Sequence, residues 1–234
     1  MNYLKTACEI WSDFVLNIFP AICINCNSTL VRDEQFICSK CKLSLPRTND
    51  HLDPTNRRYQ KFAYEPKITH VSSFLDYNRQ GVARKLIHAI KYRGETELAI
   101  LLGRMYGIDL VSCAQLKPDF IVPVPLHPRK QAKRGFNQSE IISMGISEVI
   151  GVPVESDIVR RNTFTATQTK KSKVNRWENV GNVFEVSNPQ RLEGKNIMIV
   201  DDVLTTGATL GSLATQIANC GGKEVYLISL AGGA

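Results

Sequence analysis

Two adjacent carboxylates followed by a polar turn form the segment of this sequence with the clearest chemistry. Asp201 and Asp202 come directly after the apolar run 196–200, and two residues later the chain reads Thr205, Thr206, Gly207, Ala208 and Thr209. Amides and hydroxyls in such a turn can converge on one phosphate, because glycine permits close approach and a helix N-terminus favours an anion. Carboxylates only accept hydrogen bonds, so they suit ribose hydroxyls or a divalent cation. The alternative is that the pair merely caps a helix.

A second segment joins a short apolar run to a cluster of basic residues. The run 120–122 leads through Val124 and Pro125 to a group of four cations: Arg129, Lys130, Lys133 and Arg134. Prolines fix the backbone, so this basic loop is expected to hold its amides and charges toward an anion. Another basic run contains Lys170, Lys171 and Lys173. The alternative for both runs is an ordinary solvated surface loop.

Four of the seven cysteines stand in two pairs with the spacing of a zinc ribbon: Cys23, Cys26, Cys38 and Cys41. Four thiolates complete a tetrahedral shell around zinc, so such a site is structural rather than catalytic. A module this small depends on its metal for much of its folding free energy. A redox cysteine pair and chance are the alternatives. The remaining cysteines, Cys8, Cys113 and Cys220, lie in apolar helical patterns and are expected to be buried thiols.

The elements that position these residues alternate between strand and helix. Apolar runs predict strands at 68–77, 120–122, 197–200 and 225–230, and helical spacing predicts helices between them. This alternation predicts an α/β fold with a mostly parallel sheet flanked by helices, and ligands bind such sheets at the carboxyl ends of the strands. Residues 46–67 show little apolar periodicity and are punctuated by Pro, Asn and Asp, which predicts a linker. We therefore expect three parts: an N-terminal helix and zinc ribbon at 1–45, the linker at 46–67 and the α/β domain at 68–234.

The composition is typical of a folded, soluble protein. Of 234 residues, 43% are hydrophobic and 22% are charged, and 29 basic against 22 acidic residues leave a net charge of +7. This excess permits a polyanionic partner without requiring one. The N-terminus predicts an amphipathic helix with one apolar face (Leu4, Cys8, Trp11, Val15 and Ile18), too short to insert across a membrane. The odd number of cysteines fits reduced thiols, so we expect a cytoplasmic protein.

Longer strings of residues indicate a particular protein family. Pro125-Leu126-His127-Pro128 is followed by Arg134-Gly135-Phe136-Asn137-Gln138-Ser139, and Lys91-Tyr92-Arg93-Gly94 lies upstream. With the cysteine pairs and the acidic segment, these strings resemble the ComF family of competence-associated proteins over nearly the whole chain. The segment 199–209 by itself resembles the binding motif for 5-phosphoribosyl 1-pyrophosphate (PRPP) in type I phosphoribosyltransferases.

The resemblance implies a type I phosphoribosyltransferase fold and a division of labour among the residues. Asp201 and Asp202 bind the ribose 2- and 3-hydroxyls, and residues 205–209 cradle the 5-phosphate. Val124 and Pro125 belong to a loop that binds the pyrophosphate with Mg²⁺, and the candidate catalytic cations are Arg129, Lys130 and Arg134. Related enzymes that act on 6-oxopurines carry an aspartate base where this chain has Thr205, which disfavours hypoxanthine and guanine as substrates.

The resemblance also implies a role in DNA uptake during natural transformation. Single-stranded DNA and a DNA-uptake helicase are the partners expected from it. Phosphate contacts are expected from residues 129–134 and from the second basic run, which contains Lys170, Lys171 and Lys173. Two alternatives are a PRPP- or nucleotide-sensing module without turnover and a base phosphoribosyltransferase unrelated to DNA uptake. The acceptor of a transfer reaction is not indicated by the sequence.

Overall fold

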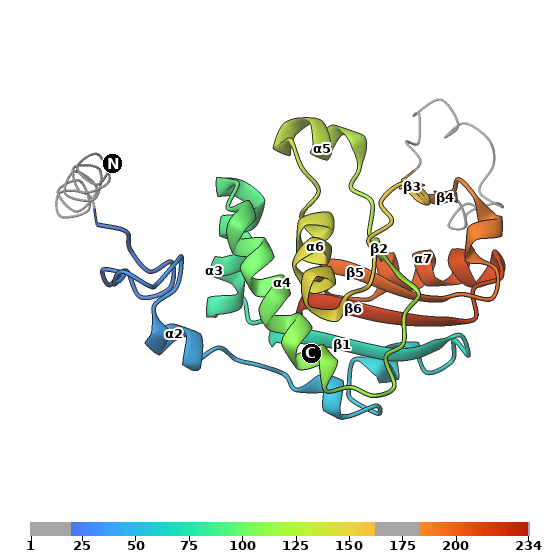
Figure 1. The fold of residues 1–234 in the computed structure, drawn as a ribbon, viewed down its shortest axis with the longest axis horizontal. Coiled ribbons are helices and arrows are strands. Elements are labelled where there is room, and N and C mark those ends of the chain that lie inside the picture. Colours follow the sequence, from blue (N-terminus) through green and yellow to red (C-terminus); the bar gives the residue numbers. More distant parts are fainter. Residues whose placement is uncertain (1–19, 162–182, 234) are drawn as a thin grey trace, which may run out of the picture. The chain divides into compact units, whose positions relative to one another are not determined.

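A four-stranded parallel sheet lies at the centre of the larger of two units into which the chain divides (Figure 1). The structure is a computed structural model that describes residues 20–161 and 183–233, and the units are residues 1–46 and 47–234. The strand order is β1 (Ile68–Asp76), β6 (Glu224–Gly232), β5 (Asn196–Leu204) and β2 (Phe120–Pro123). The predicted parallel sheet is confirmed, and a short antiparallel pair that was not predicted, β3 (Val159–Arg161) and β4 (Phe184–Val186), accompanies it.

Helices cover both faces of this sheet. Successive residues of a strand point to opposite faces, and Ile197 and Ile199 of β5 belong to a buried cluster with Leu213 of α7 (Ala208–Asn219). On the other face, Met198 lines a cavity of about 380 Å³ together with Leu110 of α4 (Thr96–Val111) and Val149 of α6 (Gln138–Ile150). The sheet is therefore buried on both sides, as its unbroken apolar strands require.

Two glycines let α4 and α6 approach closely. A Cβ at Gly103 of α4 would clash with the carbonyl oxygen of Ile142, and one at Gly145 of α6 would clash with that of Ile100. The close crossing fixes the start of α6 relative to the sheet. Two further helices lie toward the carboxyl ends of the sheet strands. They are α3 (Val82–His88), which continues into the π-helical turn η3 (Ala89–Arg93), and α5 (Pro128–Arg134).

Strand β5 is longer than predicted. The sequence predicted a strand ending at Val200, but β5 continues through Asp201 and Asp202 to Leu204. Its partner β6 supplies the reason, because Asp201 pairs with Ser229 and Leu204 pairs with Gly232 in the parallel register. Burial of the apolar strand β6 thus carries the polar end of β5 beyond its other neighbour, β2.

The first basic segment is a helix rather than the loop that was expected. Helix α5 begins with Pro128, a residue suited to the first helical turn, and His127 caps it by accepting a hydrogen bond from Arg129 N at Nδ1 (3.2 Å). Gly135, at φ 81°, ends the helix in the left-handed conformation. The capping signals were present in the sequence, but the three prolines around them suggested irregular backbone.

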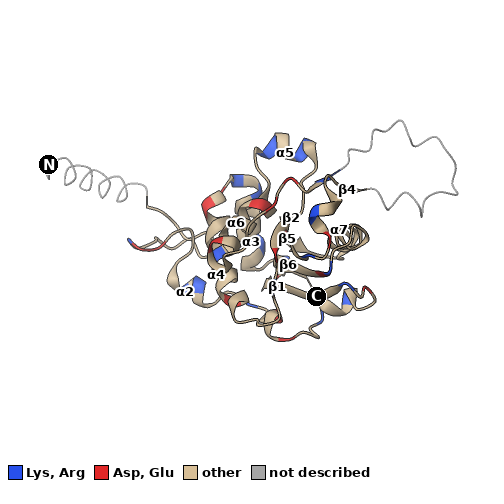
Figure 2. Ribbon diagram, turned by 45° about the vertical axis from the view of Figure 1, so that its right-hand side comes forward, with Lys and Arg blue, Asp and Glu red and all other residues tan. Residues whose placement is uncertain are grey.

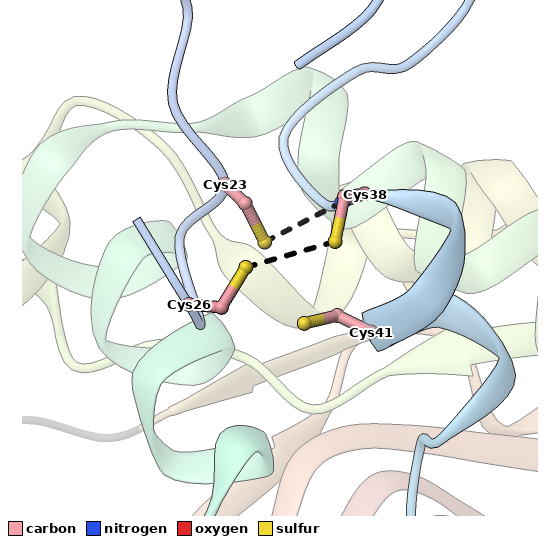
Figure 3. Close-up of side chains that lie close together, drawn as sticks. All are labelled: Cys23, Cys26, Cys38 and Cys41. Atoms are coloured by element: carbon pink, nitrogen blue, oxygen red, sulfur yellow. Dashed lines mark hydrogen bonds between the residues drawn. The ribbon is translucent and has the colours of Figure 1, made fainter. Parts of the chain in front are cut away.

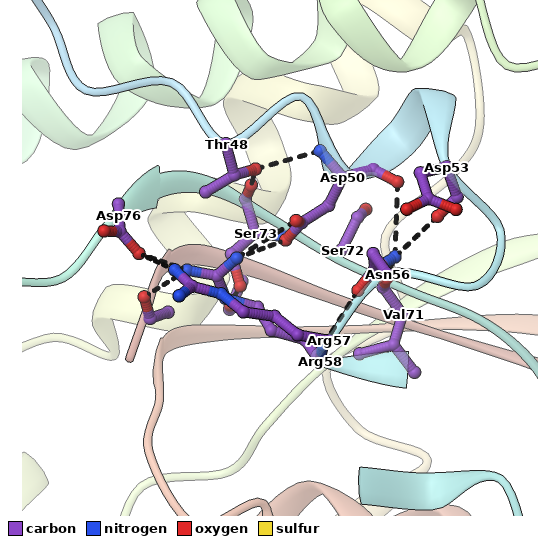
Figure 4. A network of polar contacts seen from close by, with 12 residues as sticks. Thr48, Asp50, Asp53, Asn56, Arg57, Arg58, Val71, Ser72, Ser73 and Asp76 are labelled. Carbon is purple, nitrogen blue, oxygen red and sulfur yellow. Dashed lines mark hydrogen bonds and ion pairs between the residues drawn. The ribbon is translucent and has the colours of Figure 1, made fainter. Parts of the chain in front are cut away.

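Residues 46–67 were predicted as a linker, but all of them from Arg47 onward are part of the larger unit. They contain two 3-10 turns, η1 (Asp50–Leu52) and η2 (Tyr59–Phe62), and the Asn56 amide Nδ2 donates to the carbonyl oxygen of Val71 in β1 (2.8 Å, Figure 4). Two of the polar side chains that indicated a linker, Asp50 and Asn56, are buried because they form hydrogen bonds with neighbouring side chains and the backbone. Short 3-10 turns have no periodic spacing of apolar residues, so the sequence pattern predicts neither a helix nor a strand there.

Arg58 holds this segment to the carboxyl end of the sheet. Its guanidinium is 1% exposed, donates to both carboxylate oxygens of Asp50 (2.8 and 3.0 Å), and also reaches Asp76 and the carbonyl oxygen of Gly232, both at 2.6 Å (Figure 4). Asp76 ends β1 and Gly232 ends β6. One buried cation therefore joins a loop and two strand ends.

The smaller unit contains two cysteine knuckles and the short helix α2 (Ser39–Leu43). The predicted N-terminal amphipathic helix, Cys8, and Lys170, Lys171 and Lys173 lie outside the described residues. Cys113 and Cys220, expected to be buried, are only half-buried because both lie just beyond the ends of helices. Within the described ranges, no helix has the length and apolar character needed to span a membrane.

We predict that Arg58→Ala lowers the free energy of unfolding by about 3–5 kcal/mol, because it leaves the buried Asp50 carboxylate without its cation. The neighbouring Arg57 is the matched control: it also pairs with Asp76, but its side chain is 52% exposed. Arg57→Ala should cost under about 1 kcal/mol. Urea unfolding of both variants measures the difference, and equal losses would show that Arg58 does not hold the segment in place.

Candidate functional site

The two carboxylates lie on the part of β5 that extends beyond the end of its neighbour β2. Pro123, the last residue of β2, pairs with Val200, so Asp201 and Asp202 follow the point where pairing on that side stops. The start of α6 fills the space: Ser139 Oγ donates to Asp201 (3.0 Å) and Gln138 Nε2 donates to Asp202 (3.4 Å). Each carboxylate is therefore oriented by its own donor from the same helix.

Asn137 explains why these donors are so placed. Its side-chain oxygen accepts from Ser139 N (3.2 Å) and caps α6, while its Nδ2 donates to the carbonyl oxygen of Val124 (3.1 Å). The Asn-Gln-Ser string thus caps the helix, ties it to the loop after β2 and orients both carboxylates. Val124 itself is buried, and its amide donates to Val200 O (2.9 Å), so its N–H group is not left for a ligand. Pro125, next in this loop, is half-buried.

Lys91 supplies the cation. It projects from the π-helical turn η3, and its Nζ lies 2.9 Å from both oxygens of Asp202. Turns of this kind are rare and are frequent at functional sites. Gly94, at φ 74°, ends the turn. Sequence analysis placed Lys91 in a family string without giving it a role, since only the fold brings it to a residue 111 positions away.

The arrangement makes ionisation of the Asp201 carboxyl unfavourable. Desolvation by burial, followed by the charge of Asp202, raises the pKa of Asp201 to about 7. Hydrogen bonds from the Asp202 amide (2.8 Å) and from Ser139 oppose that rise. The pair consequently sits at a point where a ligand with hydroxyl donors or a cation would relieve repulsion.

The polar turn begins helix α7 and forms a small hollow beside Asp201. Thr205, Thr206, Gly207, Ala208 and Thr209 line that hollow together with Asp201. Gly207 precedes the helix at φ 84°, and a Cβ there would clash with the ring of Phe62. Lys61 Nζ donates to Thr205 O (3.2 Å). Two adjacent residues of η2, which sequence reasoning assigned to a linker, therefore pack against the turn.

In the structure the turn 205–209 and Asp201 line the same hollow, and the candidate cations lie on α5. Arg129, Lys130 and Lys133 are exposed there, and the guanidinium carbon of Arg134 lies 5.4 Å from the centre of the Tyr92 ring. Figure 2 shows the basic residues of α5 at one end of the larger unit. Among the described residues, none of these four cations forms an ion pair.

The four predicted cysteines converge in the smaller unit (Figure 3). Their sulfur atoms all lie within 4.8 Å of one another, and those of Cys26 and Cys38 are 3.7 Å apart. Tetrahedral ligands about 2.3 Å from zinc are separated by roughly 3.8 Å, so the donor set fits one ion. The cluster is compatible with a metal site.

This geometry agrees with the relatives of the chain. Residues 127–234 match the phosphoribosyl transferase domain family. DNA utilization protein YhgH of Escherichia coli (strain K12) is 33% identical over 210 residues, which are 88% of each chain. Competence protein F of Haemophilus influenzae is 26% identical over 93% of this chain and 99% of its own. The fold is therefore that of a type I phosphoribosyltransferase domain.

More particularly, this chain belongs to the ComF family, which the sequence strings had indicated. Competence protein ComFC of Bacillus subtilis (strain 168) is a further relative, 26% identical over 82% of this chain and 87% of its own. Among solved structures, glutamine PRPP amidotransferase from B. subtilis is similar at 23% identity with a TM-score of 0.41. That match covers 56% of this chain and 25% of the amidotransferase.

We predict that Asp201→Asn stabilises the protein at pH 8 by about 1–2 kcal/mol, because it removes a buried charge beside Asp202. The pKa of Asp201 is higher folded than unfolded, so ionisation destabilises the folded state increasingly from about pH 4 and fully above about pH 7. The gain should therefore shrink as the pH falls toward 5. Unfolding curves at both pH values measure it.

Asp202→Asn is the control for this experiment. It removes the partner of Lys91, which is only 22% exposed, so no gain is expected. A gain from Asp201→Asn that does not depend on pH would contradict the electrostatic explanation.

Proposed function

We propose that the carboxylate site binds PRPP in the presence of Mg²⁺. The observation that carries this proposal is the juxtaposition of an oriented carboxylate pair with a glycine-containing turn at the start of α7. The carboxylates of Asp201 and Asp202 accept from the ribose 2- and 3-hydroxyls, and the turn donates to the 5-phosphate. These roles leave the C1 end of the sugar and its pyrophosphate on the side of Lys91 and the loop after β2.

We further propose that the domain transfers the phosphoribosyl group. The bond between C1 and the pyrophosphate oxygen breaks with its electron pair on pyrophosphate, and an acceptor forms a new bond to C1 and gives up a proton. Arg129, Lys130 and Arg134 are the candidate cations that neutralise the leaving group, and Mg²⁺ supplies further charge neutralisation when bound. Lys91 is added to these candidates, because its ammonium already faces the site.

A second candidate function is PRPP or nucleotide sensing without turnover. The contact between Lys91 and Asp202 favours it, since a bound ligand must change that contact and could thereby shift the turn η3. Release of pyrophosphate separates the two functions. Pyrophosphate formed from PRPP with a panel of bases or DNA supports transfer, and tight PRPP binding with no release from any member supports sensing.

We propose that the biological setting is DNA uptake in the cytoplasm, with single-stranded DNA and a DNA-uptake helicase as partners. The names of the relatives, competence protein F and DNA utilization protein, support this setting. The exposed cations of α5 fit DNA phosphates, together with Lys170, Lys171 and Lys173 outside the described residues. The metal of the cysteine cluster is proposed to be zinc, which tetrahedral thiolate sites select.

We predict that Asp201→Asn combined with Asp202→Asn abolishes PRPP binding and preserves the fold. Asp119→Asn is the matched control, because Asp119 precedes β2 at the opposite, amino end of the sheet, where it accepts from Asn196 N (2.8 Å). Calorimetry with Mg²⁺ should detect binding for the control alone. Unchanged affinity in the double variant, with circular dichroism showing an intact fold, would overturn the site assignment.

We predict one zinc ion per chain, lost when Cys38 or Cys41 is replaced by serine. Both side chains are buried beside the other two sulfurs, so a missing ligand leaves an incomplete shell. Cys113→Ser and Cys220→Ser serve as controls, because these thiols belong to the larger unit and should leave the zinc content unchanged. Elemental analysis of the purified proteins gives the answer, and zinc-free wild-type protein that is folded would contradict the proposal.

A further inference from the structure

Three planar side chains lie together beside Lys91, the residue that contacts Asp202: the rings of Tyr92 and His88 are tilted by 43° to each other, and Arg134 is half-buried. The ring centres of Tyr92 and His88 lie 4.7 Å apart, and the guanidinium carbon of Arg134 lies 5.4 Å from the Tyr92 ring centre. Tyr92 is 68% exposed, and His88 is exposed as well. We call Tyr92, His88 and Arg134 the planar cluster. The contact of Arg134 with the Tyr92 ring joins α5 to η3. Among the described residues, no other cation–π or ring contact connects these two elements.

The position of Tyr92 in the π-helical turn explains why it faces water. Ala89 and Ile90 of that turn are buried, and Lys91 reaches Asp202. Tyr92 therefore does not contribute to the core, and its ring is held at the surface by His88 and by the cation of Arg134. A contact of this kind at an exposed site is worth only about 0.5–1 kcal/mol. The Tyr92 ring therefore stays largely exposed although His88 and Arg134 both contact it.

The charges next to the cluster fit a polyanion. On α5, Arg129 with Lys133 and Lys130 with Arg134 are each four residues apart, so all four cations share one side of the helix. Like charges at this spacing destabilise a helix, and α5 contains no acidic residue to offset them. A row of phosphates would relieve that repulsion. A single free base or nucleotide would engage only part of the row.

From these observations we infer that the planar cluster is a stacking platform for the bases of single-stranded DNA whose phosphates lie along α5. This inference rests on the DNA contact in the proposed function and identifies where the bases bind. Single strands suit the cluster because their base faces are free, whereas a duplex covers them by pairing and stacking. Each base that stacks on an aromatic ring adds about 1–3 kcal/mol with little sequence preference.

The test uses the full-length protein and two fluorescent strands of equal length. One strand is oligothymidylate, and in the other every base is replaced by an abasic site, so that the phosphates remain and the bases are absent. Tyr92→Ala should weaken binding of oligothymidylate about five- to tenfold and leave binding of the abasic strand unchanged. Tyr92→Trp should restore the loss, because it keeps an aromatic face. Anisotropy titrations at low salt give the affinities.

Tyr64 provides a matched control, since it is a tyrosine of the same unit and is 78% exposed. Tyr64→Ala should leave both affinities unchanged. Lys130→Ala combined with Lys133→Ala should weaken binding of both strands and reduce the salt slope by about 1–2 units. The two sets of variants thereby separate base contacts from phosphate contacts.

Each other outcome has a distinct meaning. Wild-type binding of oligothymidylate that Tyr92→Ala leaves intact overturns the platform and preserves the DNA contact. An equal loss for both strands also overturns it, because Tyr92 would then act by positioning Arg134 on phosphate. Wild-type protein that binds neither strand at low salt overturns the DNA contact itself and leaves the PRPP proposal standing.

Discussion

Two neighbouring carboxylates at the end of a buried strand repel each other, and much of the surrounding structure can be understood as a response to that repulsion. Ser139 and Gln138 donate to Asp201 and Asp202, and Lys91 adds a positive charge. These donors come from two elements far apart in the sequence. Burial still keeps the pKa of Asp201 above its ordinary value. The site is thus less stable than a well-paired one, which is expected of a surface prepared for a ligand.

The carboxyl edge of the sheet is reinforced by a second buried charge. Arg58 joins Asp50, Asp76 and Gly232 where strands β1 and β6 end. In the same segment, Phe62 packs against Gly207 in the turn 205–209. Residues 47–67, which precede the first strand, therefore help to hold the turn 205–209 in place. A substitution in this segment can alter ligand binding without touching a ligand, because it moves the turn against which the phosphate is expected to lie.

The turn η3 contributes one residue to the carboxylate site and the next residue to the planar cluster. Lys91 contacts Asp202 of the carboxylate pair, and the adjacent Tyr92 faces solvent beside Arg134. A ligand that displaces Lys91 from Asp202 would act on the residue next to the planar cluster. This proximity offers a physical route by which PRPP and single-stranded DNA could influence each other. The coupling free energy would be equal in both directions, because linkage between two binding sites is reciprocal.

Local sequence was enough to identify the candidate phosphate turn at 205–209 and the cysteine cluster. Asp201, Asp202 and the turn at 205–209 lie in one continuous segment, and the paired spacing of Cys23, Cys26, Cys38 and Cys41 predicted the cluster of sulfur atoms that the structure contains. The alternation of apolar runs likewise determined the parallel sheet, since each run had to be buried. In all three cases the information is short-range, so no knowledge of the packing was needed.

Only the tertiary structure decided which distant groups complete the site. The bond from Lys91 to Asp202 spans 111 residues and that from Arg58 to Gly232 spans 174, and no local periodicity records such pairings. Residues 46–67 looked like a linker because they show little apolar periodicity. The burial of Arg58 in this segment depends on Asp76 and Gly232, which are supplied by strand ends elsewhere. Sequence reveals what a residue can bind, whereas packing determines which partner is within reach.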